Sequence, residues 1–250
     1  MGQIRTGVGG WVHKPWRGTF YPPGLRQADE LTHMSGRLSV VEVNSTFQSF
    51  QTPATFAGWA ARTPENFVFC IKAHRICVNR RVLAGAGESI ETFLGQGLTA
   101  LGPRLGPILW QFMPTKAFDP ADMAAFLDLL PPERDGVRLR HAVEVRHDSF
   151  ANPAFADLCR SRKIAVCLAD HPHHPLIEAP APDFAYARLM RGRDDVATGY
   201  APEVLDAWAA RLTRLADEGR DVFAFFIKNG KLRAPAAAEA LVARIGATPT

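Results

Sequence analysis

Val41-Glu42-Val43-Asn44 and Val143-Glu144-Val145-Arg146 are the two stretches that decide the fold of this chain. Each alternates apolar and polar residues within a segment that otherwise has the composition of a buried β-strand. Residues two apart in a strand point to the same face, so each stretch places two polar side chains together. A buried acid is costly unless it is paired or reaches a wet cleft. The two stretches therefore predict a polar site at one mouth of a parallel sheet.

Strand and helix patterns alternate on both sides of these stretches. The predicted strands are Ile4–Gly9, Leu38–Asn44, Phe67–Lys72, Pro107–Phe112, Ala142–Arg146, Ile164–Ala169, Phe184–Leu189 and Val222–Phe226. The predicted helices lie around Leu25–Ser35, Pro53–Arg62, Gly87–Leu101, Pro120–Leu130, Pro153–Arg162, Pro202–Glu218 and Pro235–Ile245, and several begin near a proline. The segment after the sixth strand, His171–Pro182, has the composition of a loop or a single turn.

This count predicts an α/β fold, a single (β/α)8 barrel of the TIM type over residues 1–250. A doubly wound open sheet is the main alternative, but it lacks a Gly-rich phosphate fingerprint that opens a helix after the first strand. We expect the barrel interior to be filled from alternate strand positions. These are Val40, Val68 or Cys70, Leu109, Ala142 and Val166.

Composition narrows the class of protein. The 47% hydrophobic content is ample for a large core, and the net charge of +4 is too small and scattered for a nucleic-acid tract. The four cysteines show no C-x-x-C pair or zinc spacing, which favours buried free thiols and a reducing cytoplasm. The N-terminus lacks the apolar core of a signal peptide, and no segment is long enough to cross a bilayer. We therefore expect a cytoplasmic protein, and the sequence leaves its oligomeric state open.

Polar residues gather at the carboxyl ends of the predicted strands, where barrel active sites are built. The candidates there are Trp11, Glu42, Asn44, Lys72, Gln111, Glu144, Arg146, His147, Asp170, Tyr186 and Arg188, followed by Lys228 and Asn229. The amino ends carry no comparable set. A layer of salt bridges that plugs the barrel is the structural alternative, for example Glu42 with Lys72 and Glu144 with Arg188.

Several motifs occur in an order that resembles a known family. They are Gly9-Gly10-Trp11, Phe20-Tyr21-Pro22, Val41-Glu42-Val43-Asn44-Ser45-Thr46-Phe47, Phe69-Cys70-Ile71-Lys72-Ala73, Leu109-Trp110-Gln111-Phe112, Val143-Glu144-Val145-Arg146-His147 and Leu168-Ala169-Asp170. The chain resembles the YecE-like family, known as domain of unknown function 72 (DUF72), over nearly its whole length. The resemblance implies a TIM barrel and no established reaction.

The resemblance also implies a set of site residues. They are Glu42, Asn44, Lys72, Gln111, Glu144, Arg146, His147, Asp170 and Arg188. The chain departs from the family near its end, where Ile227-Lys228-Asn229 stands in place of an Asn-Asn-Asp-like run. That departure exchanges an acid for a base.

Three candidates carry possible catalytic roles. Glu144 is a candidate general acid or base, and an internal ion pair with Arg146 is an equal alternative. Glu42 could supply a second carboxylate, as glycosidic chemistry requires. Lys72 could bind phosphate or form a Schiff base if desolvated, although a counter-ion to Glu42 is the interpretation we favour over a covalent role. Arg188 and Arg146 have the planar donor geometry that binds carboxylate or phosphate.

Three other features each have a chemical and a structural interpretation. His171-Pro172-His173-His174 is predicted to be a solvated loop at the site mouth rather than a metal centre. The acids Glu42, Glu144 and Asp170 with His147 could hold a divalent ion, but neighbouring cations already neutralise them, so we expect no metal. The aromatic loop after the first strand could stack on a ring or a sugar face, and packing of the loop under a lid is an equal alternative. Its aromatic residues are Trp11, His13, Trp16, Phe20 and Tyr21.

The leading hypothesis is an enzyme of hydrolase or isomerase type that acts on a small anionic or sugar-like metabolite, without a cofactor. In it Glu144 is the acid–base group and Lys72, Arg146 and Arg188 hold the anion. A non-catalytic barrel that binds a ligand or a protein through the same mouth is the alternative. Nucleic-acid binding is a further alternative, which lacks a basic stripe.

Overall fold

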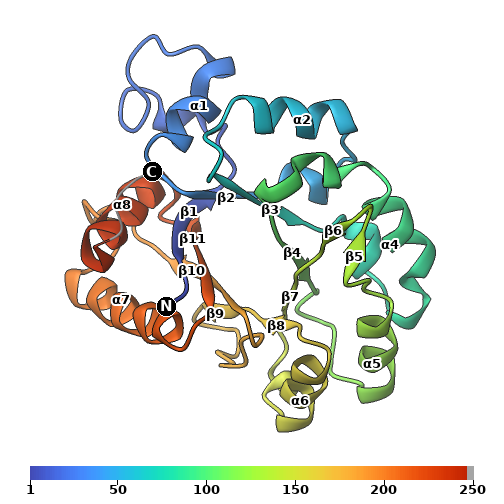
Figure 1. The fold of residues 1–250 in the computed structure, drawn as a ribbon. Helices are drawn as coiled ribbons and strands as arrows, with labels where there is room; N and C mark the ends of the chain where they lie inside the picture. The colour runs from blue at the N-terminus through green and yellow to red at the C-terminus, as the bar shows by residue number, and fades with distance from the viewer. Residues whose placement is uncertain (247–250) are drawn as a thin grey trace.

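The computed structural model describes residues 1–246, which form a ring of parallel strands with helices outside it (Figure 1). Nine segments form one sheet in the order β8-β7-β4-β3-β2-β1-β11-β10-β9. Their bounds are β1 Ile4–Gly9, β2 Val40–Val43, β3 Val68–Lys72, β4 Leu105–Gln111, β7 His141–Glu144, β8 Ala165–Val166, β9 Leu168–Asp170, β10 Phe184–Arg191 and β11 Asp221–Asn229. β8 and β9 are parts of one strand interrupted only at Cys167, so the ring is the predicted TIM-type barrel, whose sixth strand is split.

The helices connect consecutive strands on the outside of the ring. Their bounds are α1 Glu30–Ser35, α2 Pro53–Ala61, α3 Arg75–Val78, α4 Gly87–Leu94, α5 Pro120–Asp128, α6 Pro153–Ser161, α7 Pro202–Asp217 and α8 Ala234–Ile245. Proline at the first position and a side-chain N-cap explain where three of them begin. The first backbone N–H of a helix has no partner within the helix, so proline loses nothing there, and the capping side chain accepts a hydrogen bond from another such N–H. The caps are Thr52, Asp119 and Asn152. The described residues between β9 and β10 contain no helix, as the composition of that segment predicts.

The structure adds features that the patterns did not predict. An antiparallel hairpin pairs β5, Glu133–Arg134, with β6, Val137–Arg138. Its turn is Asp135-Gly136, and both residues have positive φ, of 52° and 74°, as a tight hairpin turn requires. The helix predicted over Gly87–Leu101 ends early, because Gly97 takes a φ of +93° and starts a separate 3-10 segment.

A compact apolar cluster fills the barrel interior beneath the strand ends. Its members are Val40, Val68, Cys70, Leu109, Ala142, Ala165, Cys167, Ala169, Ala181, Phe184, Tyr186, Met190, Phe223, Phe225 and Ile227. The prediction for Val166 was wrong. It pairs in register with Val143, and both belong to the outer cluster under the helices, whereas Ala165 pairs with the inward Ala142. Small side chains on β7 and β8 thereby face large aromatic ones on β10 and β11.

The state of the cysteines and the length of the helices bear on two further expectations, buried free thiols and the lack of a membrane-spanning segment. All four cysteines are buried and free. Within residues 1–246, no helix has the length and apolar character needed to cross a membrane.

Candidate functional site

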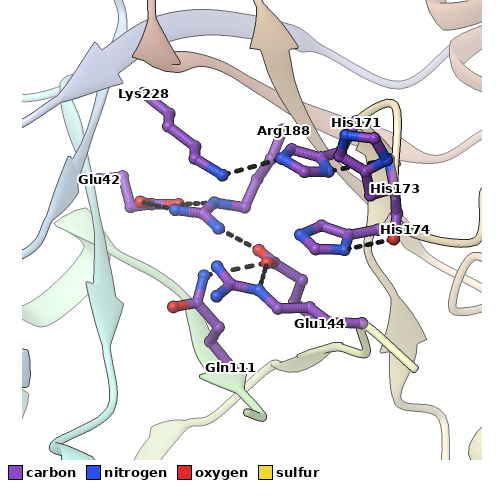
Figure 2. A network of polar contacts seen from close by, with 9 residues as sticks. Glu42, Gln111, Glu144, His171, His173, His174, Arg188 and Lys228 are labelled. Carbon is purple, nitrogen blue, oxygen red and sulfur yellow. Dashed lines mark hydrogen bonds and ion pairs between the residues drawn. The ribbon is translucent and has the colours of Figure 1, made fainter. Parts of the chain in front are cut away.

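Arg188, on β10, spans the barrel interior and links two carboxylates from different strands (Figure 2). Its Nε and Nη2 donate to the carboxylate of Glu42 at 2.9 and 3.0 Å, and its Nη1 donates to Glu144. Tyr186 donates its hydroxyl hydrogen to Glu42 at 2.8 Å. Gln111 and Arg146 donate to Glu144 at 3.0 and 2.8 Å. Each carboxylate therefore accepts three hydrogen bonds.

The register of the sheet explains why these side chains meet. Neighbouring residues in a parallel sheet share an orientation, and Glu144 pairs with Gln111 while Glu42 pairs with Cys70 of the interior cluster. Arg188 pairs with Phe225, another interior residue. Polar residues at the last inward position of several strands thus form one layer above the apolar cluster, as the sequence predicts.

This layer holds its charges firmly. Burial alone would raise the pKa of Glu144, but the charges and hydrogen bonds of Arg188 and Arg146 outweigh it and hold that pKa at about 2. Burial opposes the charge of Arg188 as well, yet the two carboxylates raise its pKa above the ordinary value. Glu144 stays ionised at neutral pH with its acceptor positions occupied, so its environment favours the ion-pair interpretation over a role as general acid or base.

Lys72 lies in the same layer but outside these ion pairs. It pairs in register with the inward Leu109, and its Nζ lies 4.3 Å from the centre of the Phe47 ring. Within the described residues, no carboxylate lies within 4.0 Å of Nζ, so the expected pair with Glu42 does not form; Glu42 binds Arg188 instead. Burial lowers the pKa of Lys72, and the positive charge of Arg188 lowers it further, to about 8.

A cavity of about 300 Å³ opens above this layer. It is lined by Gly9, Trp16, Asn44, Lys72, Gln111, Arg146, Arg188, Met190, Phe226, Ile227, Lys228, Lys231 and Ala234. Five of these residues are cationic and none is a carboxylate. The two buried carboxylates balance Arg188 and Arg146, which leaves three lysines without a carboxylate within 4.0 Å among residues 1–246. The cavity therefore has an excess of positive charge.

Gly9 shapes the wall of this cavity. A Cβ atom at Gly9 would lie 2.8 Å from Cγ2 of Ile227 and 3.0 Å from Nδ2 of Asn44. Asn44 in turn donates to the backbone oxygen of Glu42 at 3.3 Å. The absence of a side chain at this position leaves room for Asn44 to point into the site.

The histidines after the sixth strand lie close to the cavity-lining residue Lys228, as Figure 2 shows. His171 stacks on His174 with ring centres 3.7 Å apart, and Nζ of Lys228 lies 2.8 Å from Nε2 of His171. Burial and then the neighbouring His174 and Lys228 lower the pKa of His171 to about 4, so its ring is neutral at pH 7. Within residues 1–246, no group of three His, Cys, Asp or Glu side chains is placed to hold a metal ion.

Seven of the sequence candidates do not line the cavity. Three are Asn229 and the two carboxylates of the layer below it, Glu42 and Glu144; the other four are Trp11, His147, Tyr186 and Asp170. Trp11 packs edge-on against Trp59 at 5.2 Å, which places its ring among the loop contacts. His147 caps the turn Asp148–Phe150 by accepting from the backbone N–H of Ser149 at 3.2 Å. Tyr186 is fully buried and supports Glu42 from below.

Asp170 is the fourth, and it faces away from the site. It pairs in register with Leu189, an outward residue, so its carboxylate lies beside Tyr200 and Trp208 under the helices. Burial there raises the pKa of Asp170. Ala165, Cys167 and Ala169 hold the inward positions of this strand, so regular alternation places Asp170 on the outward face.

The sequence analysis did not single out Lys231, and it considered Trp16 only as part of the aromatic loop after the first strand. Lys231 follows β11 in a short 3-10 turn, Lys231–Arg233, and its backbone oxygen accepts from Nε1 of Trp16 at 2.8 Å. Trp16 is fully buried and lies in the first loop. Neither sits at a strand end, so strand alternation gave no signal. Lys228, part of the departure from the family motif, lines the cavity and takes a φ of +69°.

The chain resembles one known protein in sequence and two solved structures in fold. The chain is 22% identical over 261 residues to the UPF0759 protein YunF of Bacillus subtilis (strain 168), covering 90% of this chain and 89% of that protein. A DUF72 family protein from Enterococcus faecalis V583 superposes with a TM-score of 0.77 at 18% identity, covering 99% of both chains. A DUF72 family protein from Thermotoga maritima MSB8 does so with a TM-score of 0.74 at 21% identity, covering 96% of both.

The family is settled by a match along the sequence itself. The profile of the family described as "Protein of unknown function DUF72" matches residues 5–250, nearly the whole chain. This match confirms the resemblance inferred from the strand-end motifs. The protein belongs to the DUF72 family.

Proposed function

We propose that the protein is an enzyme of hydrolase or isomerase type that binds a small anionic or sugar-like metabolite in the cavity at the carboxyl end of its barrel. One observation carries the proposal: Lys72, Lys228 and Lys231 surround a cavity of about 300 Å³ and have no carboxylate partner within 4.0 Å among the described residues. Three cations that face one cavity without a carboxylate partner favour a ligand with more than one negative charge.

A phosphorylated metabolite fits this charge best. A phosphate monoester carries close to two negative charges near neutral pH and offers several strong acceptor oxygens. The half-buried Arg146 adds a donor fork beside the lysines, while Asn44 and Gln111 can orient hydroxyl groups of a sugar-like body. The cavity volume lies at the small end of the range for ligand sites, which suits a metabolite rather than a polymer.

The reactive group in this proposal is Lys72 rather than Glu144. An acid–base or nucleophilic group works best when its pKa lies near the working pH. The pKa of Lys72 is about 8, whereas that of Glu144 is about 2 and its oxygens are already bound. Glu42 and Glu144 then hold Arg188 and Arg146 in place, a positioning role.

Thermal shift measurements with inorganic phosphate and glucose 6-phosphate, and with glucose as the uncharged control, test the binding step. Both anions are expected to raise the Tm, and glucose is not. Lys231→Gln removes an exposed rim charge outside the ion-pair layer, and the loss of one charged hydrogen bond is expected to weaken phosphate binding about tenfold.

Arg138→Gln is the matched control, because Arg138 is an exposed residue lining a separate cavity at the other end of the barrel. It is expected to leave phosphate binding unchanged. The proposal fails if no anion stabilises the protein, or if Arg138→Gln rather than Lys231→Gln abolishes the effect. Binding of anions with no turnover of any phosphorylated sugar would favour the non-catalytic barrel.

A further inference from the structure

The amine of Lys72 occupies an unusual position for a lysine. It lies at the floor of the cavity and only 8% of the residue is exposed, whereas Lys228 and Lys231 stand exposed at the rim. The nearest candidate counter-ions are already committed, because Glu42 and Glu144 each accept three hydrogen bonds from other residues. The Phe47 ring, 4.3 Å from Nζ, is a weak partner compared with a carboxylate.

We propose that Lys72 is a covalent nucleophile that forms an imine with the carbonyl carbon of the bound ligand, so that the substrate class is a small anion that carries an aldehyde or ketone group. The inference rests on the proposed function, because the anionic end must first bind at the rim lysines. Charge at the mouth and an amine at the floor suit a short molecule with the anion at one end and the carbonyl at the other.

The step balances without a cofactor. The nitrogen lone pair of the neutral Lys72 amine attacks the carbonyl carbon, and the electron pair of the C=O bond moves to oxygen, which takes up a proton. The nitrogen lone pair of the resulting carbinolamine then forms the C=N bond and expels the hydroxyl group, which leaves as water with the proton that the Lys72 ammonium released before the attack. The ammonium ion thus gives up two protons to the carbonyl oxygen, which leaves as water, and the protonated imine keeps the third.

The surroundings of Lys72 favour the neutral amine that this attack requires. Burial and then Arg188 and Arg146 disfavour the ammonium form, although Glu42 and Glu144 partly offset them. With a pKa of about 8, roughly a tenth of the amine is neutral at pH 7. An ordinary lysine is neutral less often by a factor on the order of a hundred.

Reductive trapping tests the inference. The protein is incubated with dihydroxyacetone phosphate, or separately with pyruvate, in the presence of sodium cyanoborohydride, and peptides are mapped by mass spectrometry. Glycerol 3-phosphate and lactate are the matched controls, because they carry the same anionic groups without a carbonyl. At least one carbonyl probe is expected to leave an adduct on Lys72 whose mass is that of the probe less one oxygen atom.

Two variants locate the chemistry. Lys72→Arg keeps the positive charge but cannot form the imine, so the adduct should disappear. Lys163→Arg changes an exposed lysine that lines the separate cavity at the other end of the barrel, and the adduct on Lys72 should persist. Mapping in the wild-type protein gives an answer even if Lys72→Arg does not fold.

The outcomes separate this inference from the proposed function. Glycerol 3-phosphate should raise the Tm whether or not an imine forms. Stabilisation by glycerol 3-phosphate together with no adduct from either probe, or adducts confined to other lysines, overturns the imine and leaves anion binding intact. Loss of stabilisation by every anion overturns both.

Discussion

Replacing Lys72 by methionine is expected to stabilise the folded protein at neutral pH. The fold lowers the pKa of this lysine from 10.5 to about 8, which corresponds to a cost of about 3 kcal/mol for keeping it charged. The contact with the Phe47 ring returns about 0.5–1 kcal/mol. Methionine has a similar length and no charge, so Lys72→Met should raise the free energy of unfolding by about 2 kcal/mol.

The sign of the pH dependence follows from the lowered pKa. Below pH 8 the folded and unfolded chains both carry the proton, and the full cost is present. Between pH 8 and 10.5 the unfolded chain binds more protons at this group than the folded chain, so the wild-type protein gains stability as the pH rises. The advantage of Lys72→Met should therefore shrink towards zero across that window. The charged groups that face the amine are Glu42, Glu144, Arg146 and Arg188.

Urea unfolding monitored by tryptophan fluorescence, at pH 7, 9 and 10.5, measures this difference. Lys231→Met is the control, because Lys231 is exposed at the same cavity and its replacement should change stability by no more than about 0.5 kcal/mol. The reasoning is refuted if Lys72→Met is less stable than the wild type at pH 7, or if the difference is the same at all three pH values.

Three further predictions concern the buried charges. Glu144→Gln leaves Arg188 and Arg146 short of a counter-charge and should lower the free energy of unfolding by about 3–5 kcal/mol at pH 7, measured in urea. The pKa of Glu144 lies at about 2, below its ordinary 4.5, so the stabilisation of the fold by its charge is complete above pH 4.5 and is lost as the pH falls towards 2. Acid titration followed by circular dichroism should show that Glu144→Gln lacks this part of the pH dependence. Asp170→Asn removes a carboxylate whose pKa is raised by burial and whose Oδ2 has no hydrogen-bond partner among the described residues. The substitution should therefore change the free energy of unfolding by less than about 1 kcal/mol and leave phosphate binding, measured by thermal shift, unaltered. A tenfold loss of binding would place Asp170 in the site after all.

Strand periodicity predicted the barrel and most of the polar layer because both depend on local alternation. Glu42, Glu144 and Arg188 lie at the last inward positions of apolar strands, and this placement is visible in the sequence. Alternation gave no guidance where a strand is apolar throughout. Ile164–Ala169 carries no polar residue to mark a face, so the pattern does not tell which positions point inward. Ala165, Cys167 and Ala169 do, and Val166 and Asp170 point outward.

Alternation also could not predict which side chains of the polar layer form ion pairs with one another. Arg188 reaches across the interior to Glu42, over a span that strand order does not reveal, and this leaves Lys72 without its expected counter-ion. Lys231 joins the site through a turn, whose direction depends on tertiary contacts such as that with Trp16. Local sequence patterns therefore predict where the site lies, but its ion pairs and its excess positive charge depend on the tertiary structure.

The bridge from Arg188 to Glu42 and Glu144 also means that the proposed ligand site can form only after nearly the whole chain has been made. It joins residues 146 and 44 positions apart in sequence, from the second, fifth and seventh strands of the ring. Contacts of such separation form late, because loop closure must precede them. A fragment that ends before β10 would carry two buried acids with no guanidinium between them. Neither half of this barrel could hold the site alone, so binding of an anion at the mouth would report that synthesis and closure of the ring are finished.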